Sequence, residues 1–97
     1  MELQNFGVTV RKLREKKGLL LRQVAATLEI DTALISKIER SERKANREQV
    51  IKLAEILDVE ADELIVTWLS DKIVEILEKE PLAHKALKNS EKRIKNK

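Results

Sequence analysis

The chain has 97 residues, of which 38% are charged and 42% are hydrophobic, and its formal net charge is +3. This length allows one small domain, or one domain with an extension, and only a modest core. The chain contains no cysteine, which excludes disulfides, thiolate metal sites and cysteine nucleophiles.

No apolar run approaches the roughly 20 residues that a membrane-spanning helix needs. The N-terminal stretch MELQNFGV lacks the basic region and apolar core of a signal peptide. We therefore expect a cytoplasmic protein that makes no contact with a membrane.

Apolar residues recur at helical spacing and no alternating strand pattern occurs, which predicts an all-α protein. The first helix is predicted over about residues 6–17. Asn5 is its candidate N-terminal cap, and Gly18 follows its end, where a residue without a Cβ is favoured. One face of this helix carries Phe6, Val10 and Leu13.

The second helix is predicted over 21–28, and the third begins after Asp31 and ends near Ser41. The Asp31 carboxylate is expected to cap the first turn of the third helix. Only the residues EID join the two helices, so they must cross steeply, which is the geometry of a helix-turn-helix. The second helix is expected to bury Val24, Ala25 and Leu28, with Ala25 at the closest approach of the two helices. Ile30, Ile35 and Ile38 are expected to fill the angle between them.

Asn46 begins the fourth helix and forms a capping-box pattern with Gln49. Its apolar stripe is Val50, Leu53, Ala54 and Leu57. A long fifth helix is predicted from Ala61 to about Lys79, with acidic residues in its first turn, where the helix dipole favours them. Pro81 ends or kinks it. A weaker sixth helix, with a fraying basic end, carries Leu82, Ala83, Ala86, Leu87 and Ile94.

Charge is segregated along the chain. Basic residues are in excess over 40–47 and again over 81–97, whereas acidic residues are in excess over 61–80. Segregation of this kind suggests a polyanionic partner more strongly than the net charge does. Ordinary solvated helix faces are the alternative explanation.

Four segments, VRKLREKKGL, RQVAATLEID, ISKIERSER and VIKLAEILDVEADEL, occur in this order within residues 6–66. In order and spacing the chain resembles the XRE family of Cro-like and phage-repressor-like DNA-binding domains. The resemblance implies a five-helix helix-turn-helix domain over 1–66, here with an extended fifth helix. It also implies a prokaryotic, nucleoid-associated transcriptional regulator that binds double-stranded DNA as a homodimer on a palindromic operator. No cofactor or metal is expected.

Transferred position by position, the resemblance places the base-reading side chains on the third helix, the recognition helix of about residues 32–41. These are Thr32, Ala33, Ser36, Lys37 and Arg40, whose donors, hydroxyls and methyl suit base edges in the major groove. The expected phosphate-binding residues are Arg22, Gln23, Arg43, Lys44, Asn46 and Arg47. The alternative for any one of these side chains is a solvated helix face.

Arg14 and Glu39 match positions that often form an ion pair in the family, and an unpaired carboxylate at Glu39 would be costly near the core. We assign this pair to structure. The chain departs from the family pattern where Glu29 and Ser41 replace glycines and Ala45 replaces a proline. Leu20 and Leu21 replace a hydroxyl cap and a phosphate-binding glutamine, so that phosphate anchor is expected to be absent.

The extension over 67–97 is expected to dimerise. A fifth helix of this length spans about 28 Å, more than a small core covers. It would leave an exposed apolar strip, the predicted dimer interface, formed by Trp68, Leu69, Ile73, Ile76 and Leu77. In the alternative arrangement the sixth helix folds back to cover this strip. The basic tail either attracts DNA weakly or only solubilises the chain.

Catalysis has little support in the sequence, because His84 is the only histidine and no cleft is implied. Stand-alone XRE proteins include restriction–modification controllers, phage-type repressors and antitoxins, and an antitoxin would hold its toxin with the C-terminal helices. A second class is an adaptor that binds a protein partner and no longer reads DNA. Neighbouring genes and footprinting would discriminate among these.

Overall fold

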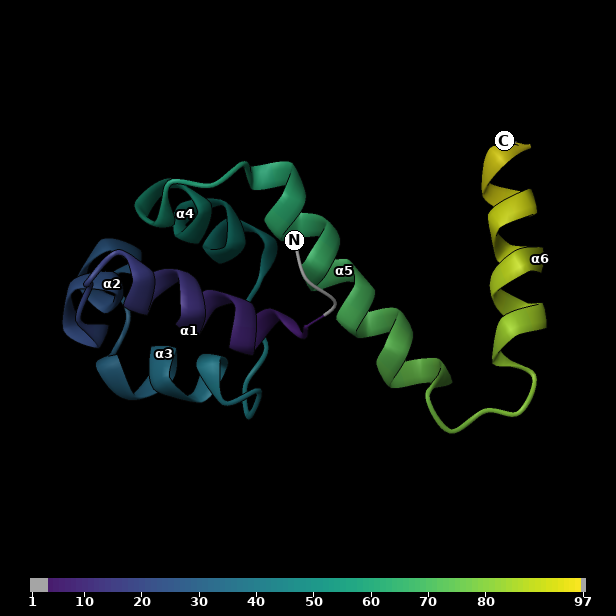
Figure 1. Ribbon diagram of the computed structural model, residues 1–97, viewed down its shortest axis with the longest axis horizontal. Helices are drawn as coiled ribbons and strands as arrows, with labels where there is room; N and C mark the ends of the chain where they lie inside the picture. The colour runs from purple at the N-terminus through teal and green to yellow at the C-terminus, as the bar shows by residue number, and fades with distance from the viewer. Residues whose placement is uncertain (1–3, 97) are drawn as a thin grey trace.

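The computed structural model describes residues 4–96, which form six helices and no strand (Figure 1). The helices are α1 (Phe6–Lys16), α2 (Leu21–Leu28), α3 (Thr32–Glu39), α4 (Arg47–Leu57), α5 (Ala61–Leu77) and α6 (Ala83–Lys95). Residues 1–3 of the predicted N-terminal domain and Lys97 of the predicted basic tail lie outside the described part. The all-α prediction is confirmed, and predicted helix ends differ from the observed ones by at most two residues.

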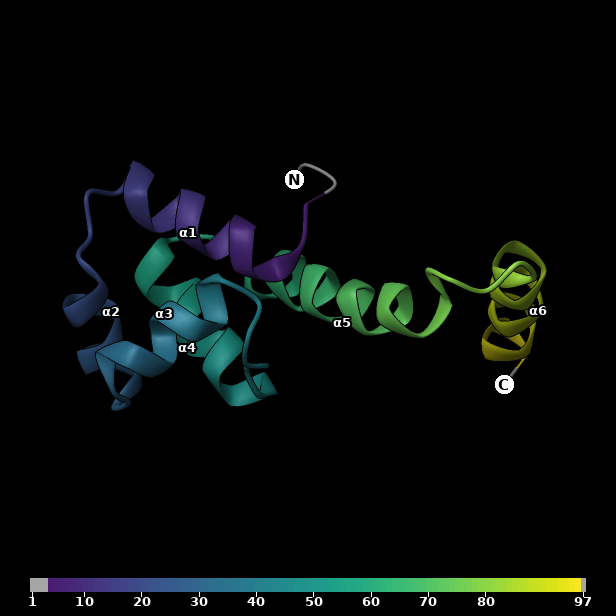
Figure 2. The same ribbon diagram turned by 90° about the horizontal axis from the view of Figure 1, so that it is seen from below.

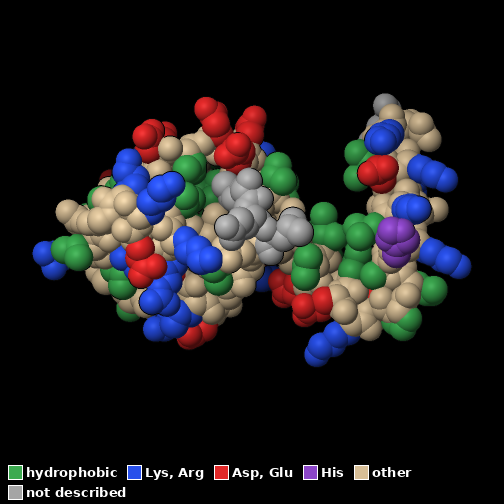
Figure 3. Space-filling model, in the orientation of Figure 1, with side chains coloured by type: hydrophobic (Ala, Val, Ile, Leu, Met, Phe, Trp, Pro, Cys, Tyr) green, Lys and Arg blue, Asp and Glu red, His purple; other side chains and the backbone are tan. Residues whose placement is uncertain are grey.

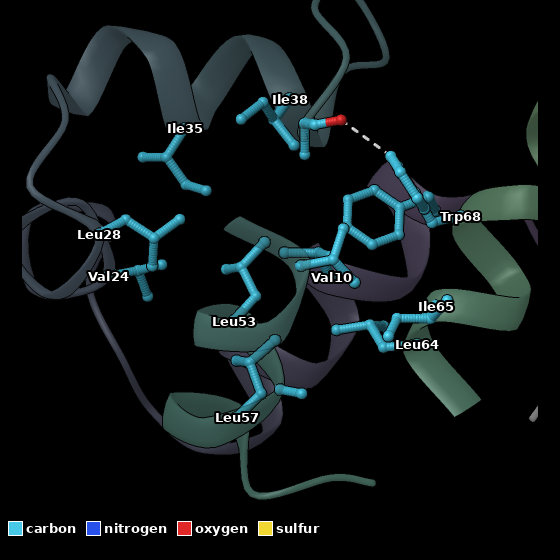
Figure 4. Close-up of a cluster of buried hydrophobic side chains, with 14 of the residues drawn as sticks. Val10, Val24, Leu28, Ile35, Ile38, Leu53, Leu57, Leu64, Ile65 and Trp68 are labelled. Atoms are coloured by element: carbon cyan, nitrogen blue, oxygen red, sulfur yellow. Dashed lines mark hydrogen bonds between the residues drawn. The ribbon is translucent and has the colours of Figure 1, made fainter. Parts of the chain in front are cut away.

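One apolar core lies between α1–α4 and the first half of α5 (Figure 4). Val10, Val24, Ile35, Val50 and Leu53 are fully enclosed in it. The predicted apolar faces of the first four helices all point into this core. Its remaining members are Phe6, Ala25, Leu28, Ile38, Ala45, Ala54, Leu57, Leu64, Ile65 and Trp68.

Side-chain caps form at two helix starts as the sequence predicts. Asn5 Oδ1 accepts a hydrogen bond of 2.8 Å from Val8 N at the start of α1. Asn46 and Gln49 form a reciprocal capping box at the start of α4, with bonds of 2.8 and 2.9 Å. These bonds satisfy amides that the first helical turn leaves without partners.

The predicted carboxylate cap at Asp31 is wrong. Asp31 occupies the N-cap position with extended backbone, but its side chain accepts no hydrogen bond from the first turn of α3. The turn is closed by the Asp31 carbonyl alone, which accepts from Leu34 N at 3.0 Å. Asp31 is exposed, so its carboxylate can accept hydrogen bonds from water instead of from the first-turn amides.

Two non-glycine residues adopt the left-handed conformation where the family has glycine. Glu29 has φ 57° at the end of α2, and Ser41 has φ 62° shortly after α3. A side chain in this region costs roughly 1–2 kcal/mol. The helix-turn-helix geometry therefore forms with some backbone strain at both ends of α3.

The second half of α5 extends beyond the core, and α6 lies apart from the other helices in both ribbon views (Figure 2). The radius of gyration is 15.0 Å, compared with about 13 Å for a compact chain of this length. Pro81 stands in the connection between α5 and α6, four residues beyond Leu77, at which α5 ends. The C-terminal third therefore makes the molecule elongated.

The prediction that Trp68 belongs to the exposed apolar strip is wrong. Its side chain is only 9% exposed, and its Nε1–H donates to the Ala45 carbonyl at 2.8 Å (Figure 4). Helical rotation places Trp68 on the face of α5 that also carries Leu64 and Ile65, so it belongs to the core. The apolar residues that remain exposed on α5 include Leu69, Ile73 and Ile76.

Candidate nucleic-acid interface

The outer face of α3 carries the predicted base-reading side chains. Ile35 and Ile38 fix the opposite face in the core. Helical rotation then brings Thr32, Ala33, Ser36 and Lys37 to one side of α3, where three are exposed and Ser36 is half-buried. This face offers hydroxyl, ammonium and methyl groups to an external ligand.

Arg40 lies at the C-terminal end of α3 and already has a partner. Its Nε lies 2.6 Å from Glu42 Oε2, and both side chains are about half exposed. An exposed pair of this kind contributes about 0–1 kcal/mol, so a phosphate or a base edge can replace Glu42. The sequence did not predict this local pair.

The predicted phosphate-binding residues surround α3 on two sides. Arg22 and Gln23 lie in the first turn of α2, while the others lie between α3 and α4 or at the start of α4. All are exposed: Arg22, Gln23, Arg43, Lys44, Asn46 and Arg47. Helix N-termini add partial positive charge and free amides at the same places.

Three of these residues also make bonds within the chain. Gln23 Oε1 accepts from Leu20 N at 2.7 Å, while the Leu20 side chain caps no amide of α2. Asn46 is part of the α4 capping box. Lys44 Nζ lies 2.8 Å from Glu75 Oε2 on α5. The Gln23 amide group still has its NH₂ to donate outward.

Arg14 and Glu39 form the predicted ion pair beneath this surface. Arg14 Nε and Nη2 donate to the two Glu39 carboxylate oxygens at 2.7 and 3.0 Å, and Nη1 donates to the Leu19 carbonyl at 2.9 Å. The hydrogen bonding that Arg14 donates to the Glu39 carboxylate is the main cause that raises the pKa of Arg14. The Arg14 guanidinium therefore stays charged, and its bonds to Glu39 join α1 to the end of α3.

A helix-turn-helix family model matches residues 10–64, which is more than half of the chain. The chain belongs to the XRE family of helix-turn-helix transcription regulators. The match covers all of α2, α3 and α4, and it includes most of α1 and the first turn of α5.

Solved structures agree with this assignment. The restriction–modification controller protein C.AhdI from Aeromonas hydrophila is 36% identical, with a TM-score of 0.57, over 61% of this chain and 89% of its own. The DNA-binding domain of the P22 C2 repressor is 28% identical, with a TM-score of 0.61, over 67% of this chain and 86% of its own. No curated protein matches this chain.

The clp gene regulator ClgR from Corynebacterium glutamicum is only 18% identical, so it shows the fold alone. Its similarity covers 92% of this chain and 84% of its own, with a TM-score of 0.60. This XRE-family chain therefore shares with ClgR an arrangement that extends beyond the helix-turn-helix domain.

Tertiary contacts join the α3–α4 connection of this XRE-family protein to α5. They comprise the Lys44–Glu75 pair and the Trp68–Ala45 hydrogen bond. Lys72 Nζ lies 3.8 Å from the centre of the Trp68 ring, a cation–π contact on the same helix. The sequence did not predict the Lys44–Glu75 pair or the Trp68–Ala45 hydrogen bond, because no local pattern relates residues so far apart in the chain.

Other kinds of site find little support in residues 4–96. None of their helices is both long enough and apolar enough to cross a membrane. Nor do these residues bring together three or more His, Asp or Glu side chains in a geometry that could hold a metal ion.

Proposed function

We propose that this protein binds double-stranded DNA in a sequence-specific manner, as a homodimer on a palindromic operator. The observation that carries the proposal is the position of α3. Its inner face is fixed in the core, and its outer face is flanked on both sides by exposed basic residues. An α-helix presented in this way fits the major groove, and flanking cations suit the phosphates on either side.

In this proposal residues 1–66 bind DNA and α3 enters the major groove. Thr32, Ala33, Ser36, Lys37 and Arg40 read base edges. The phosphate contacts come from Arg22, Gln23, Arg43, Lys44, Asn46 and Arg47. Lys44 and Arg40 exchange their intramolecular carboxylates for DNA as binding occurs.

The homodimer is proposed because residues 67–97 leave apolar side chains of α5 and α6 exposed, among them Leu69, Ile73, Ile76 and Leu87. Association through these helices would place two copies of α3 on one DNA. Recognition helices about 34 Å apart meet successive major grooves on one face of the duplex. This spacing accounts for a palindromic operator.

Footprinting on the DNA upstream of the gene tests the proposal. The unmodified chain should protect a palindromic site, and Lys37→Ala and Arg40→Ala should each lose that protection. Lys79→Ala is the matched control, because it removes an equal charge from an exposed residue beyond α5. Unselective binding that neither α3 variant alters would contradict sequence-specific recognition.

A restriction–modification controller is the favoured subclass, since C.AhdI is such a controller and is 36% identical. A methyltransferase or endonuclease gene beside this gene would support it. The second candidate function is that of an antitoxin or adaptor whose C-terminal helices hold a protein partner. The exposed apolar residues of α5 and α6 favour that candidate, and a small toxin gene beside this gene would support it.

A further inference from the structure

The outer half of α5 carries an apolar strip that the core does not use. Val66, Leu69, Ile73 and Ile76 follow one another at intervals of three, four and three residues, and each is at least 40% exposed. This is the spacing by which one helix packs along another in a coiled coil. The core residues Leu64, Ile65 and Trp68 lie on a different face, so the helix has two apolar sides.

A second strip of the same kind runs along α6. Ala83, Leu87, Ser90 and Ile94 lie at intervals of four, three and four residues, which puts them on one face. Leu87 is 42% and Ile94 71% exposed, and no residue of α6 is buried. Exposed apolar faces of this extent mark an interaction surface.

Charge indicates which helix pairs with which. The described part of α6 carries five cations, at positions 85, 88, 92, 93 and 95, against Glu91 alone. The helix α5 carries the opposite excess, with four acidic residues, Asp62, Glu63, Asp71 and Glu75, against Lys72 alone. Two α6 helices would repel each other, whereas α6 against α5 joins opposite charges.

The helix α6 lies apart from the α5 of its own chain (Figures 1 and 2), and two backbone turns form the connection between them. Glu80 N donates to the Leu77 carbonyl at 2.9 Å, and Ala83 N donates to the Glu80 carbonyl at 3.1 Å. Pro81 fixes the backbone between these turns. Apolar side chains border the open notch between α5 and α6 on the face seen in Figure 3.

We propose that α6 of each protomer packs on the α5 strip of its partner, so that two copies of this chain exchange their C-terminal helices. A two-fold axis makes the two α5–α6 contacts equivalent, and together they cover all four exposed strips. The inference rests on the homodimer of the proposed function and specifies which surfaces form it. A second copy supplies both the apolar face and the opposite charge that each strip lacks.

Engineered disulfides test the pairing directly, because the chain has no cysteine of its own. Two forms that differ by a size tag are prepared, one with Ile73→Cys and the other with Leu87→Cys, each at the centre of its strip. They are mixed in equal amounts, oxidised in a glutathione buffer, and separated on a non-reducing gel. Lys92→Cys, on the opposite face of α6, replaces Leu87→Cys in the matched control.

The expected main product is the mixed Ile73–Leu87 disulfide, in roughly tenfold excess over either homodisulfide, because a disulfide needs Cβ atoms about 4 Å apart. The Lys92→Cys control should give little of it. A second pair, Leu69→Cys with Ser90→Cys, repeats the test if either first variant lacks the helical circular dichroism of the unmodified chain. A predominance of homodisulfides would overturn the exchange, as would internal closure of a chain that carries both cysteines.

The outcome separates this inference from the proposed function. Light scattering on the unmodified chain reports the dimer, and footprinting reports operator binding. A dimer that protects its operator but forms homodisulfides refutes the helix exchange and leaves the proposed function intact. A chain that stays monomeric on its operator refutes both the exchange and the homodimer.

Discussion

Lys44, in the connection between α3 and α4, pairs with Glu75 on α5 at 2.8 Å between Nζ and Oε2. Lys44 belongs to the proposed phosphate-binding set, whereas Glu75 lies on the helix proposed to dimerise. The two surfaces therefore meet at one ion pair. Both side chains are more than half exposed, so the pair is weak enough for a DNA phosphate to replace the carboxylate.

Glu75→Gln should strengthen DNA binding, because it frees Lys44 for a phosphate. The expected gain is about twofold to fivefold in Kd, since an exposed pair is worth about 0–1 kcal/mol. Fluorescence anisotropy with operator DNA measures it. The gain should vanish in a Lys44→Ala background, because the two changes act on one interaction.

Glu78→Gln is the matched control for that experiment, since it removes the same charge one turn further along the chain. An equal gain from Glu75→Gln and Glu78→Gln would show that only the net charge matters. The Lys44–Glu75 pair would then have no specific influence on DNA binding.

Arg14→Ala should destabilise the fold by about 3–5 kcal/mol, because it leaves the Glu39 carboxylate buried without its bidentate partner. Glu39 is 6% exposed. Urea denaturation followed by circular dichroism gives the free energy of unfolding. Arg11→Ala removes only the exposed Arg11–Glu15 pair and should cost less than about 0.5 kcal/mol. Equal losses in the two variants would refute the structural role of Arg14.

Lys37→Ala and Arg47→Ala should weaken DNA binding in different ways. Loss of a base contact at Lys37 should reduce discrimination against altered operators by about 1–3 kcal/mol. Loss of a phosphate contact at Arg47 should weaken binding to all sequences alike and lower the salt slope by about 1. Titrations at several salt concentrations, with operator and scrambled DNA, separate the two effects. Identical behaviour of the two variants would contradict the assigned roles.

Gly7→Ala should destabilise the protein by about 1–3 kcal/mol. A Cβ at this position would lie 2.6 Å from the backbone oxygens of both Ile38 and Glu39, so α1 and the end of α3 would have to separate. Thermal denaturation measures the loss. A Cβ at Gly18 would meet no atom within 4 Å. Gly18→Ala therefore strains only the backbone, whose φ there is 69°, at a cost of roughly 1–2 kcal/mol. An unchanged melting temperature for Gly7→Ala would mean that this close approach is absent in solution.

The local elements could be predicted because their causes are local. Helical spacing placed Val10, Val24, Leu53 and their neighbours on buried faces, and the Asn46–Gln49 pattern gave the start of α4. The short EID connection forced α2 and α3 to cross. Asp31 shows where this reasoning fails, since a residue with the right side chain at the right position still left its carboxylate in solvent.

The sequence by itself determined the six helices, the crossing of α2 and α3, and which face of α3 turns outward, because apolar periodicity and loop length act between near neighbours. Only the tertiary structure decided that Trp68 is buried, that the end of α3 approaches the backbone of Gly7 closely, and that Lys44 pairs with Glu75. Those features depend on how distant segments approach one another. Packing of the whole core sets that approach, and no spacing along the chain encodes it.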